Sequence, residues 1–428
     1  MLGIVAALFV VMLFLGVPIA AAMMFATLWP TLTDPTFAGN VNYLIRAIES
    51  GWDSTPTLAI PLFMLSGAIM ANGGISKKLF DVFAYFIGKV RAGMPCAVVI
   101  TCLFYGAISG SGPATVAAVG AMCIPILVDL GYDKVFAAAI VATAGGLGVI
   151  IPPSIPFIMY GVTTGTSVGD MFTAGIIPGF LIAALLMLYC VIYCTQHGED
   201  REKIDASVAE LRKKGLFGVF REGFWAILTP VIILGGIYSG IVTPTEAACV
   251  SVFYAIIVSC FIYRTMKVRE VWTFMKSAVR SYAPICLLLA FAIALGRVLT
   301  LLQAPTLIAN IVTSTFSNKY TFLLVLNLIL LLIGMFMDTA SAISILGPVL
   351  LVTANGFGID SVQFGVILVV NLAIGLVSPP VGINLFVASP LVGESSWTVG
   401  KKAIVPICFF LVALLLINVV PAISLILL

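Results

Sequence analysis

The sequence predicts an all-α polytopic membrane protein with an inverted repeat, in which each copy holds one re-entrant helical hairpin and one broken transmembrane helix. Three observations carry this prediction. Of the 428 residues, 61% are hydrophobic and 9% are charged, and a water-soluble protein cannot bury so large an apolar fraction. Apolar stretches of roughly 20 residues, the length that spans a bilayer, recur along the chain. Two Pro-Pro pairs interrupt such stretches 227 residues apart, at Pro152-Pro153 and Pro379-Pro380.

The apolar stretches are expected to form the membrane-crossing helices. They cover residues 2–29, 56–71, 133–164, 170–196, 224–240, 244–263, 281–302, 360–390 and 403–427. The first stretch lacks the basic start and the cleavage site of a signal peptide, so we expect a retained span.

The charged segments are expected to lie outside the bilayer. Charge falls on one side of 41–53, 76–91 and 267–280, which predicts helices along the membrane surface. The segment 196–223 carries six basic and six acidic residues, and we expect a solvated loop or a short surface helix there.

Two further regions, 93–130 and 320–357, have apolar arms on either side of a polar tip of small residues. The first tip reads AISGSGPAT (107–115) and the second reads GMFMDTASA (334–342). An apolar arm that turns back at a polar tip is typical of a re-entrant hairpin, whose irregular backbone must be buried in protein or line a cavity.

The basic residues favour one topology, with a cytoplasmic N-terminus and a periplasmic C-terminus. The first hairpin then enters from the cytoplasm and the second from outside. Eighteen of the 21 Lys and Arg residues fall on the cytoplasmic side, and only Arg46, Arg297 and Lys319 fall outside or near the outer edge. This bias is the one expected of membrane proteins.

The two Pro-Pro breaks belong to a longer internal repeat. At the same offset of 227 residues, without gaps, the pairs are Gly120 and Gly347, Gly131 and Gly358, Asp133 and Asp360, and Gly148 and Gly375. In the topology above, 133–164 and 360–390 run in opposite directions, so the repeat is inverted. Inverted repeats with interrupted helices are typical of secondary transporters, which bind their substrate near the bilayer midplane.

The breaks and tips offer groups for ions. Carbonyls freed by the prolines, and hydroxyls such as those of Ser109, Ser111 and Thr115, are suited to a hard cation, whereas helix N-termini favour an anionic group. Asp338 is an ionisable residue inside a membrane segment, which points to function. It is expected either to bind a cation or to orient the tip by accepting backbone hydrogen bonds. Close helix packing is the structural alternative for the small residues.

Other polar residues near the breaks have two interpretations. Thr163, Thr164, Asn371, Ser378 and Asn384 either face a substrate or form hydrogen bonds between helices. Arg297 either pairs with a substrate carboxylate or extends to the outer interface. Glu246 lies in GIVTPTEAA (240–248), where Thr-Pro-Thr-Glu predicts a capped helix start.

These motifs together resemble a known family. GIVTPTEAA, SGSGPATVAAVG, GVIIPPSIPFI, MDTASAISILGPVL and GLVSPPVG are similar to the large membrane subunit of TRAP (tripartite ATP-independent periplasmic) transporters, over essentially the whole chain. The resemblance implies a Na⁺-driven importer of an organic acid in a bacterial inner membrane. It also implies a four-helix small membrane subunit, expected as a separate chain, and a periplasmic substrate-binding protein.

The family resemblance further implies an elevator motion, in which a transport unit moves against a scaffold. The transport unit would comprise 93–164 and 320–390, and the scaffold 1–92 and 165–319, with 391–428 as a C-terminal span. At least two Na⁺ sites are implied. The first would use Ser109, Ser111, Gly145, Gly148 and Pro152, and the second Gly334, Met337, Asp338, Thr339, Gly375, Ser378 and Pro379. Substrate would lie between them, with Ser111, Thr115, Thr163, Asn371 and Asn384 as candidate contacts.

Three other functions are alternatives to this one. A stand-alone Na⁺:carboxylate symporter of related fold would need no binding protein, and a channel would conduct without Na⁺ or saturation. An enzyme is disfavoured because the sequence has no His–carboxylate cluster, metal-ligand pair or activated nucleophile. The expected substrate is sialic acid or a C4-dicarboxylate, and overall resemblance favours sialic acid.

Overall fold

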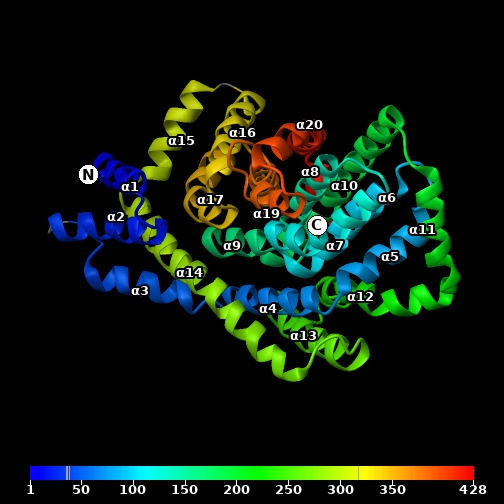
Figure 1. Cartoon of the computed structure of the whole chain (residues 1–428). Coiled ribbons are helices and arrows are strands. Elements are labelled where there is room, and N and C mark those ends of the chain that lie inside the picture. The colour runs from blue at the N-terminus through cyan, green and yellow to red at the C-terminus, as the bar shows by residue number, and fades with distance from the viewer. Residues whose placement is uncertain (35–36, 38, 317) are drawn as a thin grey trace.

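The computed structural model describes residues 1–34, 37, 39–316 and 318–428. Every secondary-structure element in these residues is a helix, as Figure 1 shows. Nine of the described helical segments are long and apolar enough to cross a membrane. The predicted all-α membrane fold is therefore confirmed.

The first apolar stretch forms two short helices, so the expected single span over 2–29 is wrong. The helices are α1 (Leu2–Phe14) and α2 (Ile19–Thr33). Gly16 takes a left-handed conformation with φ of 78°, and Pro18 then provides the N-cap of α2. A glycine and a proline two residues apart end one helix and start the next.

Three helices and one 3₁₀ turn follow before the first hairpin. They are α3 (Val41–Trp52), η1 (Thr55–Leu58), α4 (Ala59–Asn72) and α5 (Ile75–Ile87). Both segments expected as surface helices, 41–53 and 76–91, are helical over most of their length.

The first hairpin and the first broken helix follow in the expected order. The hairpin is α6 (Gly93–Ser109) and α7 (Gly112–Asp129). The broken helix is α8 (Lys134–Ala144), the 3₁₀ turn η2 (Gly145–Val149) and α9 (Ile155–Thr164). The Pro152-Pro153 bond between η2 and α9 is cis.

The middle of the chain is more helical than expected. It comprises α10 (Val168–His197), α11 (Arg201–Lys213), α12 (Gly215–Tyr238), α13 (Pro244–Ile256) with its π-helical end (Ile257–Ile262), α14 (Val268–Leu301) and α15 (Ala304–Thr315). Residues 196–223 therefore form helix ends and α11, with a loop only at 198–200.

The surface helix expected over 267–280 is not separate from the span expected over 281–302. Both belong to α14, because no glycine lies between Val268 and Leu295 and the helix accommodates its one proline, Pro284. The predicted start of α13 is confirmed. Thr243 N–H donates to the Glu246 carboxylate at 2.7 Å, and Glu246 N–H donates to Thr243 Oγ1 at 3.3 Å, which is a capping box.

The second unit has the same order of elements as the first. Its hairpin is α16 (Lys319–Phe336) and α17 (Thr339–Gly356), and its broken helix is α18 (Ser361–Gly375) and α19 (Ile383–Val392). The helices α20 (Ser396–Val419) and α21 (Ala422–Leu425) follow, so the span expected over 403–427 starts earlier and ends at Val419. Pro379-Pro380 is also cis.

The two units interlock into one body. Helix α9 packs on α17, and α19 packs on α7 and α8. A second layer, formed by α3, α4, α13 and α14, crosses beneath this body along the lower part of Figure 1. The matching order of elements agrees with the predicted repeat, and its inversion across the membrane stays a prediction.

Candidate functional site

The first hairpin tip is a tight turn whose hydroxyl groups bond to one another. Gly110 turns the chain with φ of 61°, and its carbonyl accepts from Ile155 N–H at the start of α9 (3.2 Å). The hydroxyls of Ser109 and Thr115 lie 2.9 Å apart, and Thr115 Oγ1 donates to the Ser111 carbonyl at 2.8 Å. Three oxygens of the tip, from Ser109, Thr115 and the Ser111 carbonyl, therefore lie close together.

Backbone contact joins this tip to the first break. A Cβ on Gly148 would lie 2.7 Å from the Ser111 carbonyl oxygen and would also clash with Thr115 Oγ1. A Cβ on Gly106 would lie 2.8 Å from Gly148 Cα. Only glycine fits such an approach, so the glycines of GGLGV allow the break to touch the tip.

The second tip meets the second break in the same way. A Cβ on Gly375 would lie 2.5 Å from the carbonyl carbon of Gly334. Asp338 is the N-cap of α17, where its carboxylate accepts from Ser341 N–H at 3.3 Å. The structure thus gives Asp338 the tip-orienting bond that was one of its two expected roles. Ser378 donates to the Ile374 carbonyl at 2.8 Å.

Both tips open onto one cavity of about 630 Å³ between the interlocked body and the layer of α4 and α14. The body contributes Ser109, Gly110 and Ser111 from the first tip, and Asp338, Thr339 and Ala340 from the second. The opposite wall consists of Met64, Gly67, Ala68, Ala71 and Asn72 on α4 and Ser277, Ala278, Ser281 and Ile285 on α14. The structure therefore brings the two predicted tips together around a shared space.

Four helices begin at this cavity. Its lining includes Ser111, the N-cap of α7, and Ile155, the first residue of α9. It also includes Asp338, the N-cap of α17, and Ile383, the first residue of α19. Each helix N-terminus carries a partial positive charge and N–H groups without an intrahelical partner, of which those of Ile155 and Ser341 bond to the Gly110 carbonyl and the Asp338 carboxylate. The described lining holds no Lys or Arg, and Asp338 is its one carboxylate.

The predicted ligand residues take two kinds of position. Those in the lining of the cavity are Ser109, Ser111, Asp338 and Thr339. Those at the breaks and beneath the tips are Thr115, Gly145, Gly148, Pro152, Gly334, Met337, Gly375, Ser378 and Pro379.

Three predicted contacts lie elsewhere. Thr163 donates to the carbonyl of Met159 in its own helix (2.8 Å). Asn371 Nδ2 donates to Asn327 Oδ1 on α16 (2.7 Å), the interhelical bond that was its alternative role. Arg297 donates to Ser50 Oγ on α3 at 2.8 Å, and it is not part of the cavity lining.

Asn384 connects the second unit to the first. Its Nδ2 donates to the Ala142 carbonyl on α8 at 3.1 Å, and its Oδ1 is buried without a hydrogen-bond partner. A Cβ on Gly112 would lie 3.4 Å from this Oδ1 and 3.3 Å from the Gly145 carbonyl oxygen. Two oxygens, one of them without a hydrogen-bond partner, therefore lie next to Gly112 at the start of α7.

Sequence reasoning missed the wall on α4 and α14. Small side chains repeat at helical spacing there, with Gly67, Ala68 and Ala71 on α4 and Ser277 and Ser281 on α14. That spacing was a signal in the sequence, because residues three or four apart share a helix face. It does not show which neighbour the face meets.

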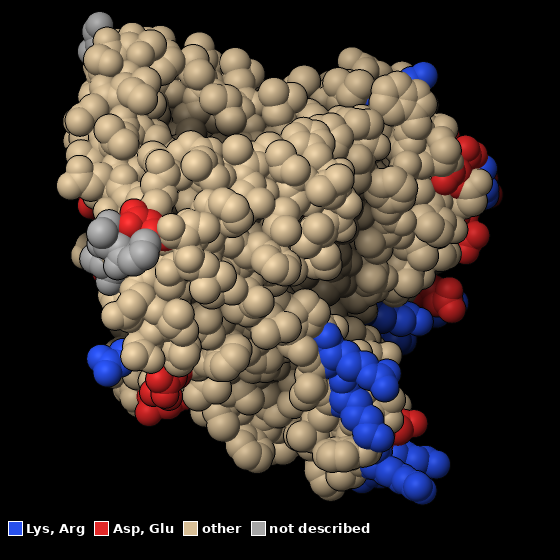
Figure 2. All heavy atoms as spheres, turned by 90° about the vertical axis from the view of Figure 1, so that its left-hand side faces the viewer, with Lys and Arg blue, Asp and Glu red and all other residues tan. Residues whose placement is uncertain are grey.

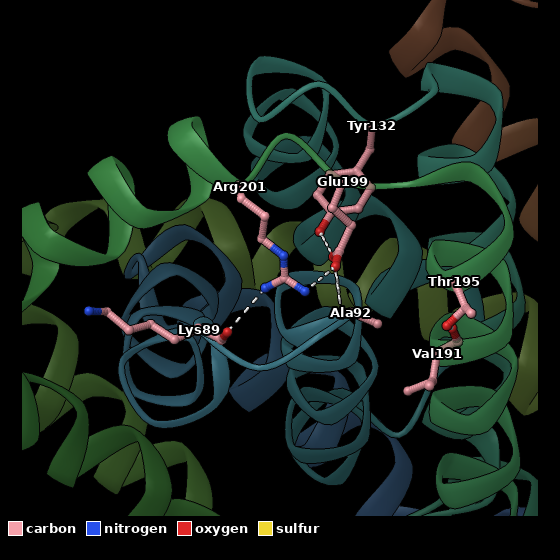
Figure 3. A network of polar contacts seen from close by, with 7 residues as sticks. All are labelled: Lys89, Ala92, Tyr132, Val191, Thr195, Glu199 and Arg201. Carbon is pink, nitrogen blue, oxygen red and sulfur yellow. Dashed lines mark hydrogen bonds and ion pairs between the residues drawn. The ribbon is translucent and has the colours of Figure 1, made fainter.

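A second polar cluster lies away from the cavity, around Glu199, whose side chain is only 2% exposed. Figure 3 shows its carboxylate between Tyr132, Ala92 and Arg201. It accepts from Tyr132 Oη at 2.6 Å, from Ala92 N–H at 3.0 Å and from Arg201 at 2.8 Å. Arg201 also donates to the Lys89 carbonyl at 3.1 Å. Burial and the neighbouring Glu199 raise the pKa of Tyr132.

The chain is similar to several transport proteins. It is 41% identical to the isethionate TRAP transporter permease protein DctMQ of Oleidesulfovibrio alaskensis, over 97% of this chain and 64% of that protein. It is 41% identical to the C4-dicarboxylate TRAP transporter large permease protein DctM of Pseudomonas aeruginosa, over 86% and 85%. It is 31% identical to the sialic acid TRAP transporter large permease protein SiaM of Vibrio cholerae, over 97% and 96%.

A solved structure shares the fold. The crystal structure of the Alcanivorax borkumensis YdaH transporter has a TM-score of 0.62 at 18% identity, over 94% of this chain and 96% of that one. The pattern of the family "Tripartite ATP-independent periplasmic transporter, DctM component" matches residues 6–423. With nearly its whole length matched, this chain belongs to the DctM family of tripartite ATP-independent periplasmic transporters.

Proposed function

We propose that this chain is the large permease of a Na⁺-coupled tripartite transporter that imports a small organic anion. The meeting of four helix N-termini at a cavity without basic side chains carries the proposal. An anion placed there would be held by backbone N–H groups and helix dipoles. Bound cations would supply the remaining charge, which makes uptake depend on the coupling ion.

The groups around the tips suit Na⁺. Hard cations prefer oxygen ligands, and the first tip holds the hydroxyls of Ser109 and Thr115 beside the Ser111 carbonyl. The buried, unpartnered Oδ1 of Asn384 adds an oxygen beside the Gly145 carbonyl. Asn384 fits this cation role better than the predicted substrate role, because it is absent from the cavity lining. The second site would use Asp338, Thr339 and the carbonyls around Gly334 and Gly375.

Membership of the family supports the proposed partners and motion. The chain would work with a four-helix small membrane subunit and a periplasmic binding protein, in a bacterial inner membrane, with its N-terminus in the cytoplasm and its C-terminus in the periplasm. The body that holds both tips would move past the wall of α4 and α14 in an elevator cycle. Relatives at 41% identity are named for isethionate and C4-dicarboxylates, which favours a small anion over the sialic acid suggested by overall resemblance.

Reconstitution tests this function. The chain is placed in liposomes with its small subunit, its binding protein is added outside, and uptake of radiolabelled succinate, isethionate and sialic acid is followed. We expect saturable uptake of one of the two smaller anions that needs an inward Na⁺ gradient and stops when K⁺ replaces Na⁺. Uptake at the same rate without Na⁺ contradicts the proposal. Full uptake by the chain alone favours the stand-alone symporter instead.

A further inference from the structure

The first half of α14 carries two parallel stripes on its exposed surface. Val268, Trp272, Met275 and Val279 form an apolar stripe and are 57%, 59%, 40% and 63% exposed. Arg269, Lys276 and Arg280, each one residue after a member of that stripe, form a basic stripe and are also exposed. Residues spaced by four, seven and eleven share a helix face, so the two stripes run side by side.

The basic stripe has no matching carboxylates. Five cations lie between residues 264 and 280 (Arg264, Lys267, Arg269, Lys276 and Arg280), against one acid, Glu270. Glu270 accepts from Lys267 N–H at 2.8 Å as part of a helix cap. None of the ion pairs in the described part of the chain includes any of the five cations. Figure 2 shows a band of Lys and Arg side chains over this lower edge of an otherwise largely uncharged face.

The segment around α11 differs from the first half of α14 in its charge balance. It holds as many acids as bases, and three of its cations are paired: Arg201 with Glu199, Lys203 with Asp200, and Lys214 with Glu222. A general surplus of cytoplasmic cations therefore does not account for the arrangement on α14. There the positive charge is local, unpaired and aligned beside apolar side chains.

We propose that this face of α14 docks the headgroups of anionic phospholipids in the adjoining leaflet, which is the cytoplasmic one in the topology given above. The apolar stripe enters the boundary of the acyl chains, and the basic stripe binds lipid phosphates. Trp272, with Lys276 Nζ 5.5 Å from its ring centroid, has the amphipathic character of residues at the membrane interface. The pairing of a cationic stripe with an apolar one favours a lipid over a soluble anion or an acidic protein.

The docking face has a direct connection to the cavity. Ser277, Ala278, Ser281 and Ile285 on α14 line the cavity, and the two stripes end at Val279 and Arg280, in the turn where this lining begins. A lipid that holds this part of α14 also fixes one wall of the cavity. This consequence rests on the proposed function, whereas the lipid binding itself does not.

The test measures lipid contact at Trp272 in the full chain. The protein is reconstituted in phosphatidylcholine nanodiscs that contain increasing fractions of brominated phosphatidylglycerol or brominated phosphatidylcholine, whose bromine atoms quench tryptophan fluorescence. The fluorescence of Trp272 is the difference between the signals of the wild type and of Trp272→Phe in the same nanodiscs. We expect the anionic quencher to half-saturate at about a tenfold lower mole fraction. The variant Arg269→Gln/Lys276→Gln/Arg280→Gln should remove this preference, and Arg269→Lys/Lys276→Arg/Arg280→Lys should keep it.

The matched control removes three exposed cations elsewhere, with Lys203→Gln/Lys213→Gln/Arg221→Gln, and should keep the preference. Size-exclusion profiles verify the fold of each variant. The proposal is overturned if the first triple variant retains the preference. It is also overturned if inorganic phosphate at 50 mM abolishes the preference while NaCl of the same ionic strength does not, which indicates a soluble-anion site. Shielding of Trp272 from both lipids once the small subunit is bound overturns it as well, because it indicates a protein interface.

Discussion

The hydroxyl of Tyr132 donates a 2.6 Å hydrogen bond to the carboxylate of Glu199, which also accepts from Ala92 N–H. Ala92 directly precedes α6, and Tyr132 follows α7. One buried carboxylate at the end of α10 therefore holds both ends of the first hairpin, at the end opposite the tip. The hairpin is fixed at its base by this bond and at its tip by the glycine contacts.

The base of the hairpin should lose stability when Glu199 is removed. Glu199→Ala leaves the Tyr132 hydroxyl and the Ala92 N–H without their acceptor, and we expect a loss of about 3 kcal/mol in the free energy of unfolding. Tyr132→Phe leaves Glu199 its other two partners and should cost about 1 kcal/mol. Thermal unfolding in detergent compares both with Asp205→Ala, an exposed carboxylate on α11. Equal stability of Glu199→Ala and Asp205→Ala argues against a role of Glu199 in holding the two ends of the hairpin together.

The glycine contacts at the tips should tolerate no side chain. Gly148→Ala and Gly375→Ala place a methyl group against backbone atoms of the tip, so we expect losses of about 2 kcal/mol each and strongly reduced uptake. Gly235→Ala is the matched control, because nothing lies within 4 Å of its added methyl group in α12. Thermal unfolding and Na⁺-driven uptake are measured together. Wild-type uptake by Gly148→Ala is incompatible with the contact described here.

Two substitutions separate the charge of Asp338 from its capping bond. Asparagine also caps helices, so Asp338→Asn should keep the melting temperature and raise the Na⁺ concentration for half-maximal uptake severalfold. Asp338→Ala should lower stability as well, by about 1 kcal/mol. Asp360→Asn, which alters the N-cap of α18, controls for loss of a capping carboxylate outside the cavity. An unchanged Na⁺ response of Asp338→Asn removes its charge from the cation site.

Asp81 on α5 should make stability depend on pH. Burial raises the pKa of its carboxyl above the ordinary value of 3.8, although Lys214 and Lys77 oppose the shift. The folded state therefore disfavours the ionised form, and stability falls as pH rises from below 3.8 through the raised pKa. Asp81→Asn removes this loss, so its advantage in melting temperature over the wild type should grow from pH 4 toward neutrality and then level off. A difference in melting temperature that stays constant from pH 4 to neutrality contradicts the raised pKa of Asp81.

The elements that the sequence predicted well are those with strong local signals. The Pro-Pro breaks and the tips at 107–115 and 334–342 combine proline, glycine and small polar residues within a few positions, and such clusters favour helix ends, so their positions were correct. Helix α14 was divided wrongly because charge and hydropathy change near residue 280 while the backbone does not. The break between α1 and α2 was missed because its flanks are equally apolar.

Partners distant in the chain could not be predicted in the same way. Asn371 and Asn384 were recognised as polar residues in apolar helices, which left open what they face. The contacts of Asn371 with Asn327 and of Asn384 with α8 depend on how the two units interlock. Glu199 likewise looked like one acid among six in a polar segment, and only its burial beneath Tyr132 shows its role.

The small side chains around the cavity have a consequence of their own. Gly67, Ala68 and Ala71 on α4, and Ala114, Ala117, Ala118 and Ala121 on α7, present little more than methyl groups. Bulky side chains on such faces would interdigitate, and any change of register would have to separate them at a cost of about 0.1–0.2 kcal/mol per atom pair. A helix face made of glycine and alanine has few such contacts to break. In the proposed elevator cycle, the same alanines that leave volume for a ligand would therefore also leave few contacts to break as the two walls move past each other.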